Sequence, residues 1–298
     1  MNFLKSLVKG TPPDPTSKVA EILPISHEPS SCNPSLCHHS YSTNCFKLDA
    51  AAEVEPLWET ADSADLHLLV STESTDWQRD PFDAPGTVLG TIKNVLNEGE
   101  KIKKLGLKLR ISATSLPLKD NEEYAIYKDQ QKCDILVMPW FIWMKGITSA
   151  NFENTLVELL TILNDGQDNL PSNIGDVTIE KDPARSYVFL CSHRTRDKKC
   201  GITAPIMKKE FDSNLRDLGL YRDIGDNRPG GVNVVFINHV GGHKFAANIL
   251  IYNKGGEFIW YARCTPLNVK PIIDEAVLKG TVFPELARNV QKYASINW

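Results

Sequence analysis

Two pairs of potential metal ligands lie in the last third of the chain. Cys191 and Cys200 flank a charged loop, and His239 and His243 flank a short segment that contains two glycines. Two thiolates and two imidazoles can complete a dinuclear iron–sulfur centre, because each iron takes two protein ligands besides the bridging sulfides. This set of side chains predicts an electron carrier.

The elements expected around these residues would bring the two pairs together. A β-rich apolar segment over 186–190 predicts a buried strand that ends at Cys191, and a second strand over 232–238 ends at His239. Because both strands belong to one predicted sheet, we expect the two pairs of ligands to lie at the same edge of it.

Cys200 is expected at the start of a helix that Thr203 caps and that continues to about Leu218. The free N–H groups at the start of a helix favour a thiolate, which is the form of cysteine that binds metal. The loop before this helix carries a basic patch, defined as Arg194, Arg196, Lys198 and Lys199. A solvated basic loop without a role in binding is the simpler interpretation of that patch.

Other chemistries could use the same four side chains. A structural zinc ion accepts two cysteines and two histidines, but the cysteines of finger-type sites are closer in sequence, and a long segment separates Cys200 from His239. Zinc therefore ranks second. A thiol oxidoreductase would ordinarily carry a Cys-x-x-Cys pair, which this sequence lacks.

Composition restricts the class of protein. A formal net charge of −4 over 298 residues argues against a protein that binds nucleic acid through its overall charge. The densest apolar run, over 135–144, is interrupted by Pro139 and is shorter than the about 20 residues of a membrane-spanning helix. The first residues show neither a secretory nor an arginine-rich mitochondrial pattern. We expect a cytoplasmic protein, with the nucleus left open, and no contact with membranes.

The first 60 residues are expected to form a disordered arm, because they are rich in polar residues and proline and show no sustained apolar period. The seven cysteines of the chain are too irregularly spaced to suggest a disulfide framework. Several of them lie in the arm, where they could bind a metal ion such as zinc or could be incidental thiols. The candidate ligands there are His27, Cys32, Cys37, His38, His39 and Cys45.

Two α/β units are expected after the arm, with a boundary near residue 170 inside a polar connection. The first unit, 61–170, has strands over 66–70, 107–113 and 133–144 and helices over 88–104 and 152–163. The second unit, 171–298, has the order βαβββα and adds a hairpin over 248–264 and a helix after Pro266. No confident sequence repeat relates the two units.

The residues around the four candidate ligands resemble a known family. The segments 191–201 and 239–248 are similar to those of the sucrase/ferredoxin-like proteins, and Asp76-Trp77 fits the same pattern. The resemblance implies a C-terminal thioredoxin-like ferredoxin domain that holds a [2Fe-2S] cluster. It also implies an N-terminal thioredoxin-like domain without a cluster, in which only His67 and Cys133 could bind metal.

The resemblance extends to the end of the chain, which is Ile296-Asn297-Trp298. In this family a final tryptophan implies presentation of an aromatic side chain to the cytosolic iron–sulfur targeting machinery. Asn297 departs from the acidic or serine residue that is usual before the aromatic. A tryptophan that packs on the final helix is the alternative.

The expected function is one-electron, proton-coupled transfer to or from a redox partner protein, or a role in redox homeostasis. Two imidazoles in place of two thiolates remove negative charge from the irons and raise the reduction potential. The resemblance leaves open an interaction or scaffold protein linked to cortical actin organisation, in which the metal is structural. No nucleotide-binding glycine pattern, P-loop or nucleophile elbow predicts a stand-alone enzyme.

Overall fold

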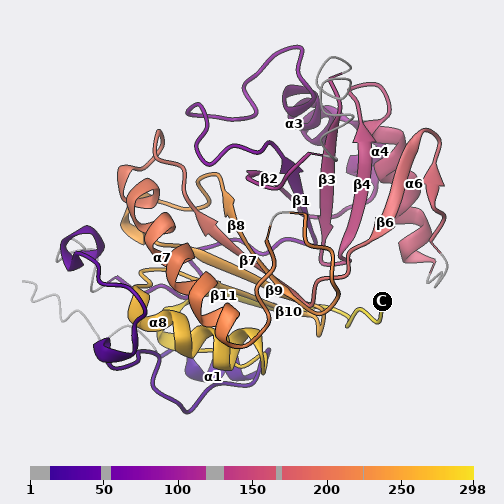
Figure 1. Ribbon diagram of the computed structural model, residues 1–298. Helices are drawn as coiled ribbons and strands as arrows, with labels where there is room; N and C mark the ends of the chain where they lie inside the picture. The colour runs from indigo at the N-terminus through magenta and orange to yellow at the C-terminus, as the bar shows by residue number, and fades with distance from the viewer. Residues whose placement is uncertain (1–13, 48–54, 119–130, 166–169, 224) are drawn as a thin grey trace, which may run out of the picture.

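The computed structural model describes residues 14–47, 55–118, 131–165, 170–223 and 225–298, and only the main chain of His243. These residues form a mixed α/β structure around one 11-stranded sheet (Figure 1). The strands are β1 (Leu66–Ser71), β2 (Leu109–Thr114), β3 (Cys133–Met138), β4 (Ile142–Ile147), β5 (Asn173–Ile174), β6 (Val177–Lys181), β7 (Ser186–Cys191), β8 (Val232–Ile237), β9 (Ile249–Asn253), β10 (Glu257–Tyr261) and β11 (Ala287–Lys292). The helices are α1 (Thr16–Ala20), α3 (Val88–Glu98), α4 (Glu100–Lys104), α6 (Phe152–Asn164), α7 (Lys198–Asp217) and α8 (Pro266–Pro271), and α8 continues into the π-helical segment η4 (Ile272–Val277). Short 3₁₀ turns are η1 (Pro34–Leu36), η2 (Thr43–Phe46), η3 (His243–Phe245) and η5 (Pro284–Leu286).

The sheet contains one strand arrangement twice, in the order β11-β10-β9-β7-β8-β2-β1-β3-β4-β6-β5. In the first group, β1 pairs parallel with β2 and antiparallel with β3, and β4 and β6 follow antiparallel. In the second group, β7 pairs parallel with β8 and antiparallel with β9, and β10 and β11 follow antiparallel. The groups meet where β2 and β8 pair antiparallel at Thr114 and Ile237.

Each group of strands is covered on one face by its own helices (Figure 1). Leu68 of β1 and Leu156 of α6 belong to the core of the first group, whereas Val188 of β7 and Phe211 of α7 belong to the core of the second. Side chains alternate between the two faces of a strand, so the residues between these positions point away from the helices. Each group therefore has a second face to cover.

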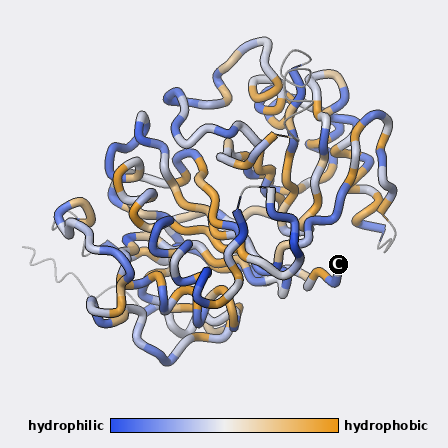
Figure 2. Tube along the Cα trace, viewed as in Figure 1, coloured by the Kyte–Doolittle hydropathy of each residue, from blue (hydrophilic) through white to orange (hydrophobic). Residues whose placement is uncertain are grey.

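Those second faces pack on one another. Leu69 of β1 and Phe189 of β7 lie in one shared apolar cluster, and the ring of Phe141 lies 6.1 Å from that of Tyr187. Apolar residues accordingly follow the strands through the middle of the molecule (Figure 2). Strand β1 is buried along its whole length, as its apolar sequence predicts.

His67 of β1 lies inside this shared interface and is 1% exposed. Its Nδ1 lies 2.9 Å from Oη of Tyr252 in the second group, and its Nε2 lies 2.9 Å from Oγ of Ser112. Burial lowers the pKa of His67 well below its usual value, and Arg110 adds to this shift. The side chain thus links the two groups as a neutral, hydrogen-bonded imidazole.

The expectation of a disordered arm is wrong for residues 14–47. Val19 and Leu23 are fully buried in the core of the second group, and Ile25 forms a β-bridge with Val282. The carboxylate of Glu210 in α7 accepts hydrogen bonds from the main-chain N–H groups of His38 and His39. A few apolar side chains and one buried carboxylate are enough to order a segment that shows no periodic pattern.

The predicted strands are present with adjusted ends, and the break expected at Pro139 separates β3 from β4. The other predicted helices are also present, but the single helix expected over 88–104 is divided at Gly99 into α3 and α4. Strands β5, β6 and β11 were not predicted, because they are short or alternate with polar residues at the edges of the sheet. Strand β6 pairs with β4, so the first group of strands extends to Lys181. The second group of strands therefore begins with β7, which pairs with β8 and β9.

Candidate metal centre

Cys191 is the last residue of β7, where the strand reaches the edge of the sheet. All six residues of β7 are buried, and Cys191 lies opposite Ile237 of the parallel strand β8. The apolar β-branched and aromatic residues of this strand explain its position in the interior of the sheet. Cys191 is 1% exposed, so its sulfur lies in an enclosed environment, as the sequence predicts for a strand-end ligand.

Cys200 lies in the first turn of α7 and is fully buried. The helix begins at Lys198, and the side chain of Asp197 caps it by accepting the N–H of Lys199 at 2.9 Å. The prediction of a cap at Thr203 is therefore wrong, since Thr203 is inside the helix and donates its hydroxyl to the Lys199 carbonyl. An earlier start shortens the loop and places Cys200 on the helix itself.

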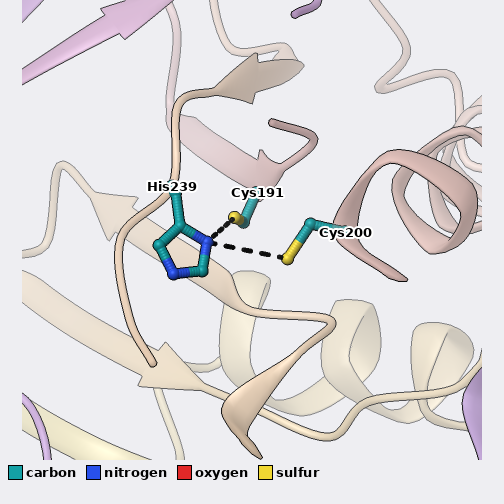
Figure 3. A group of neighbouring side chains, drawn as sticks. All are labelled: Cys191, Cys200 and His239. Carbon is teal, nitrogen blue, oxygen red and sulfur yellow. Dashed lines mark hydrogen bonds between the residues drawn. The ribbon is translucent and has the colours of Figure 1, made fainter. Parts of the chain in front are cut away.

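His239 follows β8 and completes a group of three donor side chains. Its Nδ1 lies 3.8 Å from the sulfur of Cys191 and 4.0 Å from the sulfur of Cys200 (Figure 3). The three donor atoms lie within 4.8 Å of one another. Among the described side chains this is the one group of at least three potential metal ligands.

The predicted fourth ligand, His243, begins the 3₁₀ turn η3, but its side chain lies outside the described atoms. The glycines before it have different surroundings. A Cβ on Gly241 would lie 2.1 Å from Nη1 of Arg288, whereas a Cβ on Gly242 would make ordinary contact with the ring of Phe245 at 3.7 Å. Gly241 is therefore required by the close approach of a buried arginine.

The two thiols differ in their preferred protonation state. A hydrogen bond from Cys200 lowers the pKa of Cys191, and N–H groups of Val240 and His193 act in the same direction. The same hydrogen bond, together with burial, raises the pKa of Cys200. Cys191 is therefore the thiol of the pair that loses its proton more readily, and Cys200 is the one that retains it.

His193 belongs to the site, although the sequence analysis did not select it. It is 1% exposed; its Nδ1 accepts the main-chain N–H of His239 at 3.2 Å, and its Nε2 lies 2.9 Å from the carbonyl of Trp77. The imidazole connects the His239 loop to the first group of strands. Its place two residues after Cys191 was the signal that could have identified it.

The segment after β1 supports the loop between the two cysteines. Ser192 donates its hydroxyl to the carbonyl of Thr75 at 2.7 Å, and the carboxylate of Asp76 accepts both the N–H and the hydroxyl of Thr195. Trp77 packs edge-on against His193 at 5.6 Å. Asp76 and Trp77, which fit the family pattern in the sequence, therefore contact the loop between Cys191 and Cys200.

The basic patch lies on the exposed side of this loop. Arg194, Arg196 and Lys198 are exposed, while Lys199 donates to the carbonyl of Lys47 at 3.0 Å. A Cβ on Gly201 would lie 2.2 Å from Cβ of Arg194, so this glycine lets the loop lie flat on the helix. The patch is a charged rim beside the buried sulfurs.

The potential ligands of the N-terminal segment do not form a comparable group. Cys32 and Cys37 are hydrogen-bonded to each other, and burial raises the pKa of Cys37 to about 11. His38 lies 3.1 Å from a carboxylate oxygen of Asp217, and His39 lies 2.9 Å from the hydroxyl of Ser213. These side chains fasten residues 14–47 to α7. Among the described side chains of this segment, no three potential metal ligands lie close together.

Trp298 lies on the first group of strands. The ammonium of Lys181 is 4.9 Å from the centre of its ring, and Lys254 donates to its main-chain oxygen at 2.6 Å. The tryptophan thus packs beside β6 rather than on the final helix. It is half-buried.

The family model for sucrase/ferredoxin-like proteins matches residues 57–289, which include Cys191, Cys200 and His239. The chain belongs to the sucrase/ferredoxin-like family. No solved structure matches it. No helix in the described part of the chain is long and apolar enough to cross a membrane.

The curated relatives of the chain match different shares of it. It is 38% identical over 251 residues to the actin patches distal protein 1 of Saccharomyces cerevisiae, covering 80% of this chain and 78% of that protein. It is 35% identical over 111 residues to the altered inheritance of mitochondria protein 32 of Debaryomyces hansenii, covering 37% of each. The corresponding protein of Meyerozyma guilliermondii is 32% identical over 109 residues.

Proposed function

We propose that the protein is an iron–sulfur protein in which Cys191, Cys200, His239 and His243 hold a [2Fe-2S] cluster. The convergence of two sulfurs and one imidazole nitrogen within 4.8 Å supports this proposal most directly. Apolar contacts from Val240 and Ala246 surround the sulfurs, which is the enclosed setting that tunes a redox centre. His243 enters the proposal from the sequence.

When bound, such a cluster supplies one-electron exchange. The protein determines the charge around it, because two neutral imidazoles repel an added electron less than two thiolates do. His239 turns Nδ1 toward the sulfurs, which leaves Nε2 to carry the ring proton (Figure 3). That arrangement couples electron transfer to proton transfer at Nε2.

A redox titration tests this function. We expect a reduction potential within or near the roughly −150 to +300 mV range of histidine-ligated centres, falling as pH rises between 6 and 9. The substitution His243→Cys should keep a cluster and move the potential downward. A potential that does not change with pH, or that is the same in the variant, would remove the histidines from the proposal.

We further propose that each group of strands is a thioredoxin-like unit and that the second is the ferredoxin domain. The repeated order β2-β1-β3-β4 and β8-β7-β9-β10, with one parallel and two antiparallel pairs in each, supports a common fold. In the first unit Ser71 stands at the strand end that Cys191 occupies in the second. The first unit therefore lacks a thiolate at that position.

The proposed partner is an acidic redox protein of the cytoplasm that approaches the exposed basic patch beside the sulfurs. Recognition by the iron–sulfur targeting machinery through Trp298 would require its ring to leave the ammonium of Lys181. We propose no role for nucleic acid or membranes. These assignments follow from charge and exposure.

A scaffold function linked to cortical actin is the second candidate. The names of the relatives favour it, because they refer to actin patches and to the inheritance of mitochondria, and not to electron transfer. A scaffold with a structural metal would contain zinc and would be colourless. If the protein is a scaffold, a redox-inactive variant that still folds with zinc should restore actin organisation in cells that lack the protein. If the protein is an electron carrier, replacement of the cluster by zinc should abolish its function.

A further inference from the structure

Two arginines lie over one aromatic ring beside the candidate metal centre. The guanidinium carbon of Arg110 is 4.8 Å from the centre of the Trp260 ring, and that of Arg288 is 4.9 Å from it. Arg288 is 2% exposed and comes from β11, while Arg110 comes from β2. The first and second groups of strands therefore each contribute one cation to the same place.

No described carboxylate neutralises these two cations. Arg288 donates to the hydroxyl and the carbonyl of Thr60 and to Oδ1 of Asn248, and Arg110 donates to the carbonyl of Asp62. Nη1 of Arg110 is buried without a hydrogen-bond partner. Burial lowers the pKa of Arg288 to about 10, so Arg288 remains charged at neutral pH. The acidic group that favours charged Arg288 is the thiol of Cys191, and no described carboxylate pairs with either arginine, so the cavity between them favours an anionic ligand.

A cavity of about 390 Å³ adjoins both guanidinium groups. Hydroxyls of Thr60 and Ser63 line it, and Gly241 forms part of its wall. Gly241 lies between His239 and His243. An occupant of the cavity would therefore lie beside the loop that joins these histidines and would contact neither cysteine.

We propose that this cavity is a binding site for a phosphate group, either inorganic phosphate or the head of a small phosphate monoester. Planar guanidinium groups bind tetrahedral oxyanions through two parallel N–H donors, and the hydroxyl of Ser63 adds a neutral donor, whereas that of Thr60 already donates to the carbonyl of Leu57. Asp62 lies exposed at the rim and opposes the anion, which limits the affinity. The site is spatially separate from the proposed cluster, because its lining contains neither sulfur.

Isothermal titration calorimetry of the full chain with inorganic phosphate tests the proposal, in a phosphate-free buffer of constant ionic strength. We expect saturable one-to-one binding that weakens at least tenfold in Arg110→Gln. Lys108→Gln removes an exposed positive charge two residues away and should bind as the wild type does. Asp62→Asn should tighten binding. No saturable heat with the wild type, or equal weakening by Lys108→Gln, would overturn the site.

A second variant leaves both arginines in place. Ser63→Glu puts a carboxylate at the half-buried cavity wall and should abolish binding even if Arg110→Gln proves unstable. Glycerol 3-phosphate distinguishes the sources: tighter binding than phosphate assigns a monoester, and equal binding assigns the free anion. Acetate bound as strongly as phosphate would overturn the assignment. Iron measured in the same samples separates this result from the fate of the proposed cluster.

Discussion

Gly241 shows how one residue constrains the loop between the two candidate histidines. A Cβ at this position would lie 2.1 Å from Nη1 of Arg288, whereas a Cβ on the neighbouring Gly242 has ordinary space. We expect Gly241→Ala to lower the free energy of unfolding by about 1–3 kcal/mol, the usual cost of overpacking a filled interior. Gly242→Ala is the matched control and should stay within about 0.5 kcal/mol of the wild type. Urea unfolding measures both, and equal effects would contradict the account of Arg288.

His193 acts as a positioning residue through the main chain of His239. Its Nδ1 accepts that N–H, and burial lowers its pKa, which keeps the acceptor nitrogen unprotonated. We expect His193→Ala to accelerate loss of metal to a chelator about tenfold, as for other groups that hold a ligand in place. His39→Ala, on the N-terminal segment, is the control. If both variants release metal at the wild-type rate, His193 has no such role.

At the scale of elements, the N-terminal segment is part of the second core. Leu23 is 2% exposed, and its neighbour Ile22 is 39% exposed. We therefore expect Leu23→Ala to cost about 2–5 kcal/mol of stability, and Ile22→Ala about 0.5 kcal/mol or less. Thermal or urea unfolding of the pair decides the point. Similar, small effects of both substitutions would restore the disordered arm that the sequence predicts.

The sequence predicted the central strands because uninterrupted apolar runs such as those of β1 and β7 mark strands buried on both faces. It predicted three of the four candidate ligands to lie at strand or helix ends, where Cys191, Cys200 and His239 are found. It could not predict the edge strands, whose polar residues face water. Nor could it predict contacts such as Glu210 with the N-terminal segment, because no local pattern encodes a long-range hydrogen bond.

At the scale of the whole molecule, His67 links stability to pH through the interface of the two groups of strands. Its pKa is lowered in the folded protein, so below pH about 6.5 the unfolded chain binds a proton that the folded chain excludes. Stability is thus retained above that pH and lost as pH falls. Between pH 7.5 and 5.5 this residue should remove about 1.4 kcal/mol.

Urea unfolding of the wild type and His67→Gln at the two pH values measures this effect. The substitution should reduce the pH-dependent loss by about that amount, whatever its effect on stability at pH 7.5. An unchanged pH dependence in the variant would show that the imidazole is protonated within the interface.

Within the described residues, the second group of strands carries the candidate metal centre and the first group does not, although the two share one strand arrangement. The first strand of each group ends at an equivalent position of the repeated arrangement, but β1 ends in Ser71 and β7 in Cys191. The segment after β1 instead supports the loop between Cys191 and Cys200 through Asp76 and Trp77. The two halves thus share a strand order that the sequence did not reveal as a repeat, and they carry different residues at the strand end that matters for the site.

The proposed function requires the two cysteines of the site to bind a cluster of iron and sulfide. The most direct measurement is iron and acid-labile sulfide in protein purified without oxygen, for the wild type, Cys200→Ala and Cys264→Ala. Cys264 is an equally buried thiol outside the site and serves as the matched control. We predict about two irons and two sulfides per chain in the wild type and in Cys264→Ala, and loss of both in Cys200→Ala. Wild-type protein with zinc and no sulfide, or full iron and sulfide in Cys200→Ala, would contradict the account.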